Sequence, residues 1–339
     1  MKILLMGTPE FAVPTLDALL ASSHDLVGIV TQPDAPAGRG RKLRPPPVKQ
    51  RAVEAGVAVY QPPRPVRELW PALSPDLIVV VAYGHILKSD LLDWPPLGCV
   101  NLHASLLPRR RGAAPIQWAL IEGDKETGVT SMQMVEKLDV GDILLRRRCP
   151  ISPDETAESL SEKLSGLAAA VCMETIDALG AGILTPIPQD EALATYAPKL
   201  KKEDAVLDWN QEAAAICRRI RGLCPWPVAR TRWMARGGDG AAGENGGENW
   251  LRVWMAEPES EESADDKDLK KPGNCVEAMG VPPGSIGGFQ EGPPGRRGIR
   301  VAAADGWVLL TEVQPEGKRR MDAKAFWQGY RLPEGAVVI

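Results

Sequence analysis

L-I-V-V-V-A-Y-G, residues 77–84, is the most strongly β-branched run of the chain, and it ends on glycine. A short, uninterrupted apolar run of this kind is typical of a strand buried on both faces of a parallel sheet. Similar runs occur at 2–7 and 26–30, with shorter candidates at 57–60 and 99–103. Segments with helical spacing separate these runs. The alternation predicts an α/β fold with a doubly wound sheet and right-handed crossovers.

The rhythm changes further along the chain. Two further strands, joined by a short Gly-containing loop, are predicted at T-G-V-T-S-M-Q-M-V (127–135) and I-L-L-R-R-R (143–148). They indicate a β-hairpin or a sharp reversal of the chain. Apolar residues then recur every three or four positions over 154–179, which predicts a long amphipathic helix.

Length and composition predict two domains. A chain of 339 residues is too long for one ordinary core. We expect a first domain over 1–185, a polar, aperiodic linker over 186–207 and a smaller second domain over 208–339. The second domain begins with a predicted helix at 208–223. Short strand candidates separated by turn residues then predict a small β-barrel or sandwich. The strand candidates lie at 228–234, 250–256, 298–303 and 307–313.

Two segments of the second domain do not resemble a packed core. Residues 235–249 are rich in glycine, and residues 257–274 are acidic and lack aromatic side chains. Both segments are predicted to be flexible loops.

Composition limits the class of protein. Hydrophobic residues make up 44% and charged residues 25% of the chain, as in soluble globular proteins. The six cysteines include no C-x-x-C pair, and the three histidines are far from metal-ligand spacing, so no metal site is predicted. The N-terminal apolar run is too short for a signal peptide or a membrane span. We therefore expect reduced cysteines in a cytoplasmic protein that does not enter membranes.

The segment 31–51 contrasts with the net charge of −4, since it carries six basic residues against a single acid, Asp34. A long basic loop in a compact domain is usually functional or disordered, and a mobile basic arm favours a polyanion partner such as nucleic acid. Basic clusters in the second domain add to this interpretation, although they could also be an ordinary charged surface. The basic residues of the segment are Arg39, Arg41, Lys42, Arg44, Lys49 and Arg51.

The first strand candidate ends in G-T-P-E-F-A (7–12), at the position of a dinucleotide-binding fingerprint. Only one glycine is present where G-x-G-x-x-G is needed, which argues against a nicotinamide dehydrogenase. The loop nevertheless follows the carboxyl end of a strand, where open α/β sheets place their sites.

Asn101 and His103 lie two residues apart on the strand candidate 99–103, so their side chains leave the same face. For acyl transfer, a carboxamide can stabilise a developing oxyanion and an imidazole can move a proton near neutral pH. The alternative is a core strand whose polar side chains are satisfied by their neighbours.

The loop between the hairpin strands offers a carboxylate to orient that imidazole. V-E-K-L-D-V-G-D (135–142) contains Glu136, Asp139 and Asp142, and spacing does not choose among them. Gly141 would let the loop fold back tightly. The alternative is a solvated acidic turn. Residues 105–116 form a Pro-bounded loop with three consecutive arginines, which we interpret as either the lip of a pocket for an anion or a solvated basic turn.

Together these segments resemble the methionyl-tRNA formyltransferases of the formyltransferase superfamily. The resemblance covers essentially the whole chain apart from 235–249 and 257–297. The superfamily shares the Asn-x-His and the later Asp, and the basic loop and second domain favour the tRNA-using member. The matching segments are N-L-H-A-S-L-L-P through G-D-I-L (101–144), the start M-K-I-L-L-M-G-T-P-E-F-A-V-P, the loop P-D-A-P-A-G-R-G-R-K-L, Y-A-P-K-L-K-K-E-D-A-V-L-D-W and R-I-R-G-L-C-P-W-P.

The resemblance implies a Rossmann-like formyltransferase domain followed by an OB-like β-barrel domain that binds tRNA. The implied activity is transfer of a formyl group from 10-formyltetrahydrofolate to the amino group of methionine on initiator methionyl-tRNA, for translation initiation. It also implies a monomer that needs no metal. Two alternatives are a non-catalytic RNA-binding protein on the same fold and a formyltransferase that acts on an amino sugar.

Matching positions also assign residues. The implied catalytic residues are Asn101, His103 and Asp139, the last because it is the Asp of L-D-x-G. The implied folate contacts are Ser105, Leu106, Leu107 and Pro108. The implied contacts with the tRNA acceptor stem are Arg39, Arg41, Lys42 and Arg44.

Overall fold

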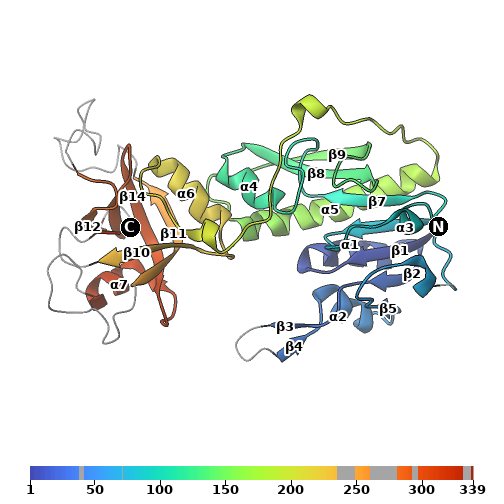
Figure 1. Cartoon of the computed structure of the whole chain (residues 1–339), viewed down its shortest axis with the longest axis horizontal. Helices are drawn as coiled ribbons and strands as arrows, with labels where there is room; N and C mark the ends of the chain where they lie inside the picture. Colours follow the sequence, from blue (N-terminus) through green and yellow to red (C-terminus); the bar gives the residue numbers. More distant parts are fainter. Residues whose placement is uncertain are drawn as a thin grey trace. The chain divides into compact units, whose positions relative to one another are not determined.

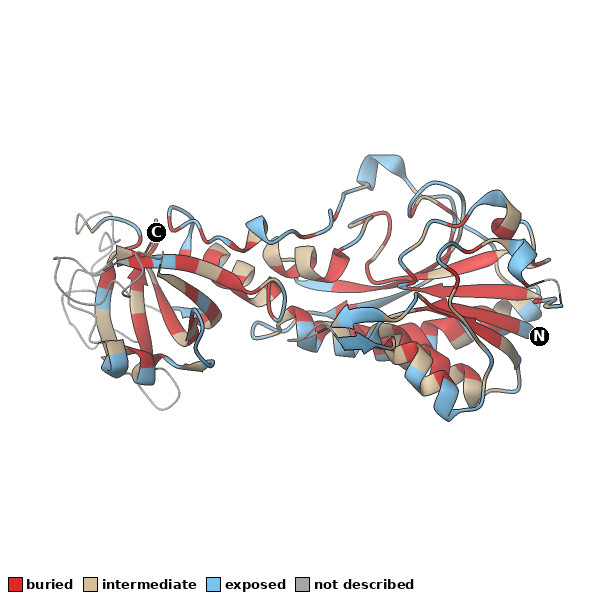
Figure 2. Cartoon of the chain, turned by 60° about the horizontal axis from the view of Figure 1, so that its bottom comes forward, coloured by how far each residue is buried: buried red, intermediate tan, exposed pale blue. Residues whose placement is uncertain are grey.

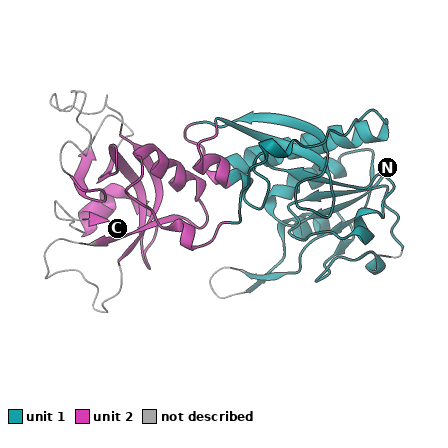
Figure 3. Ribbon diagram, turned by 45° about the horizontal axis from the view of Figure 1, so that its top comes forward, with its two compact units in different colours: residues 1–116, 125–152, 159–199 teal, residues 117–124, 153–158, 200–339 magenta. Residues whose placement is uncertain are grey.

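The structure is a computed structural model, and it describes residues 1–37, 42–70, 72–234, 249–259, 281–291, 297–330 and 337–338. The chain divides into two compact units (Figure 3). Unit 1 comprises 1–116, 125–152 and 159–199, and unit 2 comprises 117–124, 153–158 and 200–339. The change of unit between Lys199 and Leu200 lies inside the predicted linker. Most of the predicted loops at 235–249 and 257–274 lies outside the described residues.

Unit 1 is built on a seven-stranded sheet in the order β5-β2-β1-β6-β7-β8-β9 (Figure 1). The strands from β5 to β7 are parallel, whereas β8 and β9 pair antiparallel, so the predicted α/β sheet and hairpin are both confirmed. The strands are β1 (Lys2–Gly7), β2 (Asp25–Val30), β5 (Val59–Tyr60), β6 (Leu77–Val81), β7 (Cys99–His103), β8 (Glu126–Gln133) and β9 (Ile143–Pro150).

Helices connect several of the parallel strands, as in a doubly wound sheet. α1 (Val13–Leu20) lies between β1 and β2, α2 (Pro47–Glu54) between β2 and β5, and α3 (Ser89–Leu92) between β6 and β7. α4 (Pro115–Ile121) lies between β7 and β8, and α5 (Ala157–Gly180) follows β9. α5 confirms the long helix predicted over 154–179.

The core of the sheet explains why the apolar runs form strands. All five residues of β6 are buried, and the buried colour follows the central strands in Figure 2. One core cluster contains Met6, Val80 and Cys99 from three adjacent strands, together with Leu91 of α3. Because side chains alternate along a strand, the residues after Cys99 on the same face of β7 are Asn101 and His103. The polar pair therefore continues a core face toward the carboxyl end of β7.

Unit 2 contains a curled antiparallel sheet in the order β12-β13-β14-β11-β10-β16, with β15 paired to β14. A bridge between Ser285 and Val337 joins the two ends of this order, so the sheet curls back on itself. This is the barrel-like architecture expected for the second domain. The strands are β10 (Ala229–Met234), β11 (Trp250–Pro258), β12 (Ile286–Glu291), β13 (Arg297–Ala302), β14 (Trp307–Pro315), β15 (Met321–Asp322) and β16 (Val337–Val338).

Two helices accompany this sheet, α6 (Ala213–Gly222) and α7 (Ala323–Tyr330). The helix predicted from 208 begins later because Asp208 accepts hydrogen bonds from the backbone and side chain of Asn210, which forms a turn instead. No helix in the described part of the chain is long and apolar enough to cross a membrane.

Candidate active site

β7 positions two of the implied catalytic side chains. It lies between β6 and β8, with Asn101 opposite Val80 and Met132 and with His103 opposite Thr130. The His103 side chain is buried, and Asn101 is half-buried. Pairing on both sides fixes the backbone of the strand, so the two side chains are held on one face with little freedom.

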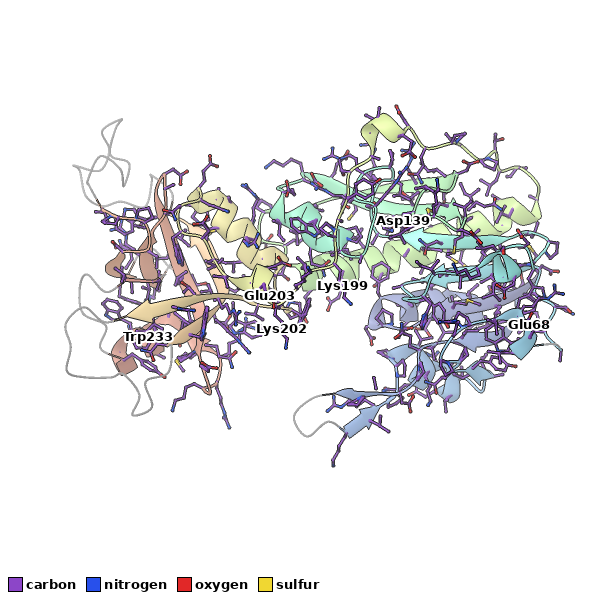
Figure 4. The ribbon with its side chains drawn as sticks, in the orientation of Figure 1. Glu68, Asp139, Lys199, Lys202, Glu203 and Trp233 are labelled. Atoms are coloured by element: carbon purple, nitrogen blue, oxygen red, sulfur yellow. The ribbon has the colours of Figure 1, made fainter. Side chains whose placement is uncertain are left out.

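The loop between β8 and β9 brings a carboxylate to this histidine. Asp139 Oδ2 lies 3.7 Å from His103 Nδ1, and the two side chains are only 6% and 7% exposed. Asp139 Oδ2 also accepts a hydrogen bond of 2.8 Å from the backbone N–H of Gly112. Glu136 and Asp142 are exposed, so of the three candidate acids it is Asp139 (labelled in Figure 4) that lies beside the imidazole.

The second nitrogen of the His103 ring is also engaged. Nε2 lies 2.9 Å from the backbone carbonyl of Arg110. A carbonyl can only accept, so Nε2 carries a hydrogen in this arrangement. Only the protonated imidazole could also donate from Nδ1 toward Asp139. The site is therefore suited to a histidine that holds and releases a proton.

The implied folate-contacting turn is tied to the hairpin. Thr130 Oγ1 accepts from the N–H of Leu107 at 3.1 Å and donates to the carbonyl of Ser105 at 2.7 Å. The Arg146 guanidinium donates to the Leu107 carbonyl at 3.0 Å. The Leu107 side chain is buried against Met132 and Ile143, whereas Leu106 is half-buried. These bonds hold residues 105–108 as a fixed turn directly after β7.

The three arginines after this turn have different environments. Arg111 is buried, with a side-chain exposure of 1%, and its guanidinium forms an ion pair with Glu191 at 2.8 Å. Both interpretations of the loop required solvent-facing arginines, and for Arg111 both are wrong. The hydrogen bonds with Glu191 are the main reason why the pKa of Arg111 is raised and that of Glu191 lowered.

Part of the basic segment forms a two-stranded ribbon, β3 (Ala35–Ala37) with β4 (Lys42–Arg44). Lys42 and Arg44 are exposed on it, while Arg39 and Arg41 lie outside the described residues. Lys49 pairs with Asp34 at 2.7 Å and Arg51 with Asp17 at 2.6 Å. These two cations are therefore compensated within the protein, and the charge of the ribbon is carried by Lys42 and Arg44 among the described positions.

The loop that follows β6 also belongs to the site, although the sequence pattern did not predict this. The Tyr83 carbonyl accepts from Thr8 Oγ1 at 3.2 Å and from Gln32 Nε2 at 3.0 Å. This ties together the carboxyl ends of β1, β2 and β6, where the strand order reverses and open sheets bind their ligands. Burial raises the pKa of Tyr83 to about 12, so this phenol stays neutral. The sequence signal that could have pointed to this loop is Gly84. Its φ of 87° is a backbone conformation that few residues other than glycine adopt.

Gln189 is a second residue of the site that the sequence pattern did not predict. Its amide nitrogen donates to the carbonyls of Asp139 and Gly141 at 2.9 and 2.7 Å. Gln189 lies in the polar segment predicted to be a linker, and no sequence signal connects it with the loop it contacts. Within the described residues there is no group of three or more His, Cys, Asp or Glu that could hold a metal ion.

Comparison with known proteins identifies the family. Residues 1–176 match the family model described as formyl transferase, and residues 199–331 match the formyl transferase C-terminal domain. The chain is 43% identical over 342 residues to the methionyl-tRNA formyltransferase of Moorella thermoacetica. The alignment covers 100% of this chain and 99% of that protein. It is 46% identical over 336 residues to that of Methylococcus capsulatus, with 98% of each chain covered. The chain belongs to the methionyl-tRNA formyltransferase family.

Solved structures support the fold of this methionyl-tRNA formyltransferase family member. The N-formyltransferase from Helicobacter canadensis in complex with folinic acid and dTDP-3-aminofucose superimposes with a TM-score of 0.61 at 13% identity, over 91% of this chain and 98% of that chain. The sugar 3N-formyl transferase WlaRD gives a TM-score of 0.62 at 13% identity, over 94% and 99%. The predicted architecture of two domains on a Rossmann-like sheet and a curled β-sheet is thus confirmed.

Proposed function

We propose that this protein transfers a formyl group from 10-formyltetrahydrofolate to the amino group of methionine on initiator methionyl-tRNA. The observation that supports it best is the buried pair of His103 and Asp139, 3.7 Å apart, at the end of the strand that carries Asn101. The full-length similarity to proteins named methionyl-tRNA formyltransferase supports the choice of methionyl-tRNA as the substrate. We further propose that the protein acts as a cytoplasmic monomer in translation initiation.

The three side chains have distinct proposed roles. The co-substrate supplies the activated formyl group. Asn101 donates from its carboxamide to the formyl oxygen as negative charge develops there. His103 holds the proton that the leaving nitrogen needs, and Asp139 orients the ring and stabilises its charged form.

The turn 105–108 is suited to one wall of the folate site. Its backbone is fixed by Thr130 and Arg146, and its side chains are short or apolar apart from the Ser105 hydroxyl, which donates to the Arg109 carbonyl at 2.7 Å. A fixed wall favours a planar, partly apolar ligand because little conformational freedom is lost when it binds. We propose that Ser105, Leu106, Leu107 and Pro108 hold the folate there.

The basic ribbon is the proposed contact for the acceptor stem. Lys42 and Arg44 are exposed on β4, and we include Arg39 and Arg41 from the sequence. Such cations neutralise phosphates without reading sequence, so they supply affinity rather than the choice of initiator tRNA.

The test is formylation of aminoacylated initiator tRNA with 10-formyltetrahydrofolate, with charged elongator methionine tRNA as the control. We expect product from the initiator. Asn101→Ala, His103→Ala and Asp139→Ala should each lower kcat by about 100-fold or more, because Asn101 and His103 act on the reacting atoms and Asp139 orients the His103 ring.

Two outcomes would contradict the proposal. Absence of formylated tRNA would favour an RNA-binding protein without activity, and formylation of a nucleotide-linked amino sugar instead would favour the sugar enzyme. A threefold change in kcat corresponds to a change of under about 0.7 kcal/mol in the activation free energy. If each alanine variant kept kcat within this range of wild type, the roles proposed for the three side chains would be wrong.

A further inference from the structure

The segment 187–197 crosses both loops of the candidate site. At one end the backbone of Ile187 exchanges hydrogen bonds of 2.8 and 2.9 Å with Ile143, at the start of β9. At the other end the N–H of Arg111 donates to Thr195 at 2.8 Å, and the N–H of Ala197 donates to Arg111 at 2.7 Å. The segment is thus fixed to the loop after β7 and to the strand that follows the Asp139 loop.

Gln189 makes the side-chain connection between these two loops. Its amide nitrogen donates to the carbonyls of Asp139 and Gly141, and its Oε1 accepts from Arg111 Nε at 3.1 Å and from Arg111 Nη2 at 2.9 Å. Asp139 has a φ of 55°, a left-handed conformation that is uncommon outside glycine. One amide that holds two carbonyls of this loop stabilises the conformation that directs Asp139 toward His103.

Arg111 sets the direction of that amide. A guanidinium only donates, so it attracts the oxygen of the Gln189 amide and turns the nitrogen toward the two carbonyls. Burying a charged group is costly unless it is paired, and the Glu191 carboxylate accepts two hydrogen bonds of 2.8 and 2.9 Å from the guanidinium. The buried arginine, the glutamine and the Asp139 loop therefore form one connected set of hydrogen bonds.

We infer that Gln189, oriented by Arg111, is a positioning residue for the Asp139–His103 pair. The inference rests on the proposed function for its effect on turnover. Its geometric content, that Gln189 holds Asp139 against His103, is independent of that function. A polar segment that composition predicts to be a linker is thus part of the active-site scaffold.

The test compares Gln189→Glu and Gln189→Ala with wild type. A glutamate at this position cannot donate to the two carbonyls, and an alanine makes neither set of bonds. We expect kcat to fall about 10- to 100-fold while the KM for each substrate stays within about twofold, because misplacement of a catalytic group by about 1 Å can cost up to about 100-fold. Asp190→Asn is the matched control on the same segment, since Asp190 is exposed and only caps the turn at Ala192.

A spectroscopic measurement separates this inference from the proposed activity. The chain has three histidines, so ring resonances of ¹⁵N-labelled histidine can be followed individually, with the His103 signal assigned from His103→Asn. In both Gln189 variants we expect the His103 ring resonances to shift at a fixed pH, while those of His24 and His85 stay unchanged. Arg111→Lys should also shift the His103 signal, because an ammonium lacks the planar fork that orients the Gln189 amide.

The inference would be overturned by unchanged His103 ring resonances in both Gln189 variants, or by equal shifts of all three histidines, which would indicate a general structural change. Wild-type protein without formylation activity would overturn the proposed function instead, and the His103 ring resonances would still decide whether Gln189 positions the pair.

Discussion

Individual residues at the candidate site adopt conformations that depend on close backbone contacts. Asp139 and Arg110 have φ values of 55° and 61°. The Asp139 carboxylate lies near Nδ1 of His103, and the Arg110 carbonyl lies near Nε2. Gly141, two residues after Asp139, lies so close to β8 that a Cβ atom would be 1.7 Å from the Gln133 carbonyl oxygen. The Asp139 loop folds back onto β8 because only glycine fits there, as the sequence predicted.

Gly141→Ala should therefore destabilise the protein and lower its activity. A clash with backbone cannot be relieved by a side-chain rotation, so we expect the free energy of unfolding to fall by at least about 2 kcal/mol, measured by urea denaturation. Gly166→Ala is the control: Gly166 lies within α5, and an added Cβ has no neighbour within 4 Å. That variant should be up to about 1 kcal/mol more stable, because alanine favours helix over glycine. Equal stability of the two variants would contradict the role of Gly141.

At the scale of elements, the basic ribbon is anchored at its base. Asp34 accepts two hydrogen bonds from Lys49 Nζ, at 2.7 and 2.9 Å, and one from Gln61 Nε2 at 2.8 Å. Lys49 belongs to α2, and Gln61 follows β5 directly. The residue that precedes β3 is thus tied to two other elements, and this fixes where the ribbon leaves unit 1.

This anchor should depend on pH. The Lys49 hydrogen bond, followed by that of Gln61, lowers the pKa of Asp34. A carboxylate with a lowered folded-state pKa stabilises fully above its unfolded value of about 3.9 and loses the effect as pH falls through the folded value. We expect Asp34→Asn to speed hydrogen exchange of the β4 and α2 amides at pH 7, and the difference from wild type to disappear in acid. Asp177→Asn, which removes a surface partner of His24, is the control. A constant difference at all pH values would contradict the anchor.

The elements also show what sequence can predict. β1 and β6 are continuous apolar runs, and such runs identify strands because burial on both faces removes alternation. β12 was missed because Gly287 and Gly288 interrupt it, yet a Cβ at Gly287 would lie 2.6 Å from the Trp307 ring. The glycine makes room for a tryptophan that is distant in sequence. Period-two spacing was enough to place Asn101 and His103 on one face. The assignment of Asp139 required the family resemblance, and the role of Gln189 could be found only from the structure, because the contacts of both residues are with positions distant in sequence.

At the scale of the whole molecule, the chain enters each unit more than once. Unit 2 includes 117–124 and 153–158, which interrupt the sequence of unit 1. Residues 1–185, predicted to be one domain, therefore contribute to both compact units. The net charge of −4 is likewise an average over parts of opposite sign. Binding of a polyanion must then depend on local cations, and salt dependence measures how many of them take part.

This gives the last prediction. The Kd for initiator tRNA should rise steeply between about 50 and 200 mM salt, because each phosphate contact releases a counterion. Replacing Lys42 and Arg44 with glutamine should lower the slope of log Kd against log salt by roughly 1.5, at about 0.7–0.9 per contact. Arg64→Gln with Lys163→Gln removes the same charge from exposed positions elsewhere and should leave the slope within about 0.5 of wild type. Equal slopes in the two double variants would show that the ribbon acts only through overall charge and does not bind the phosphates.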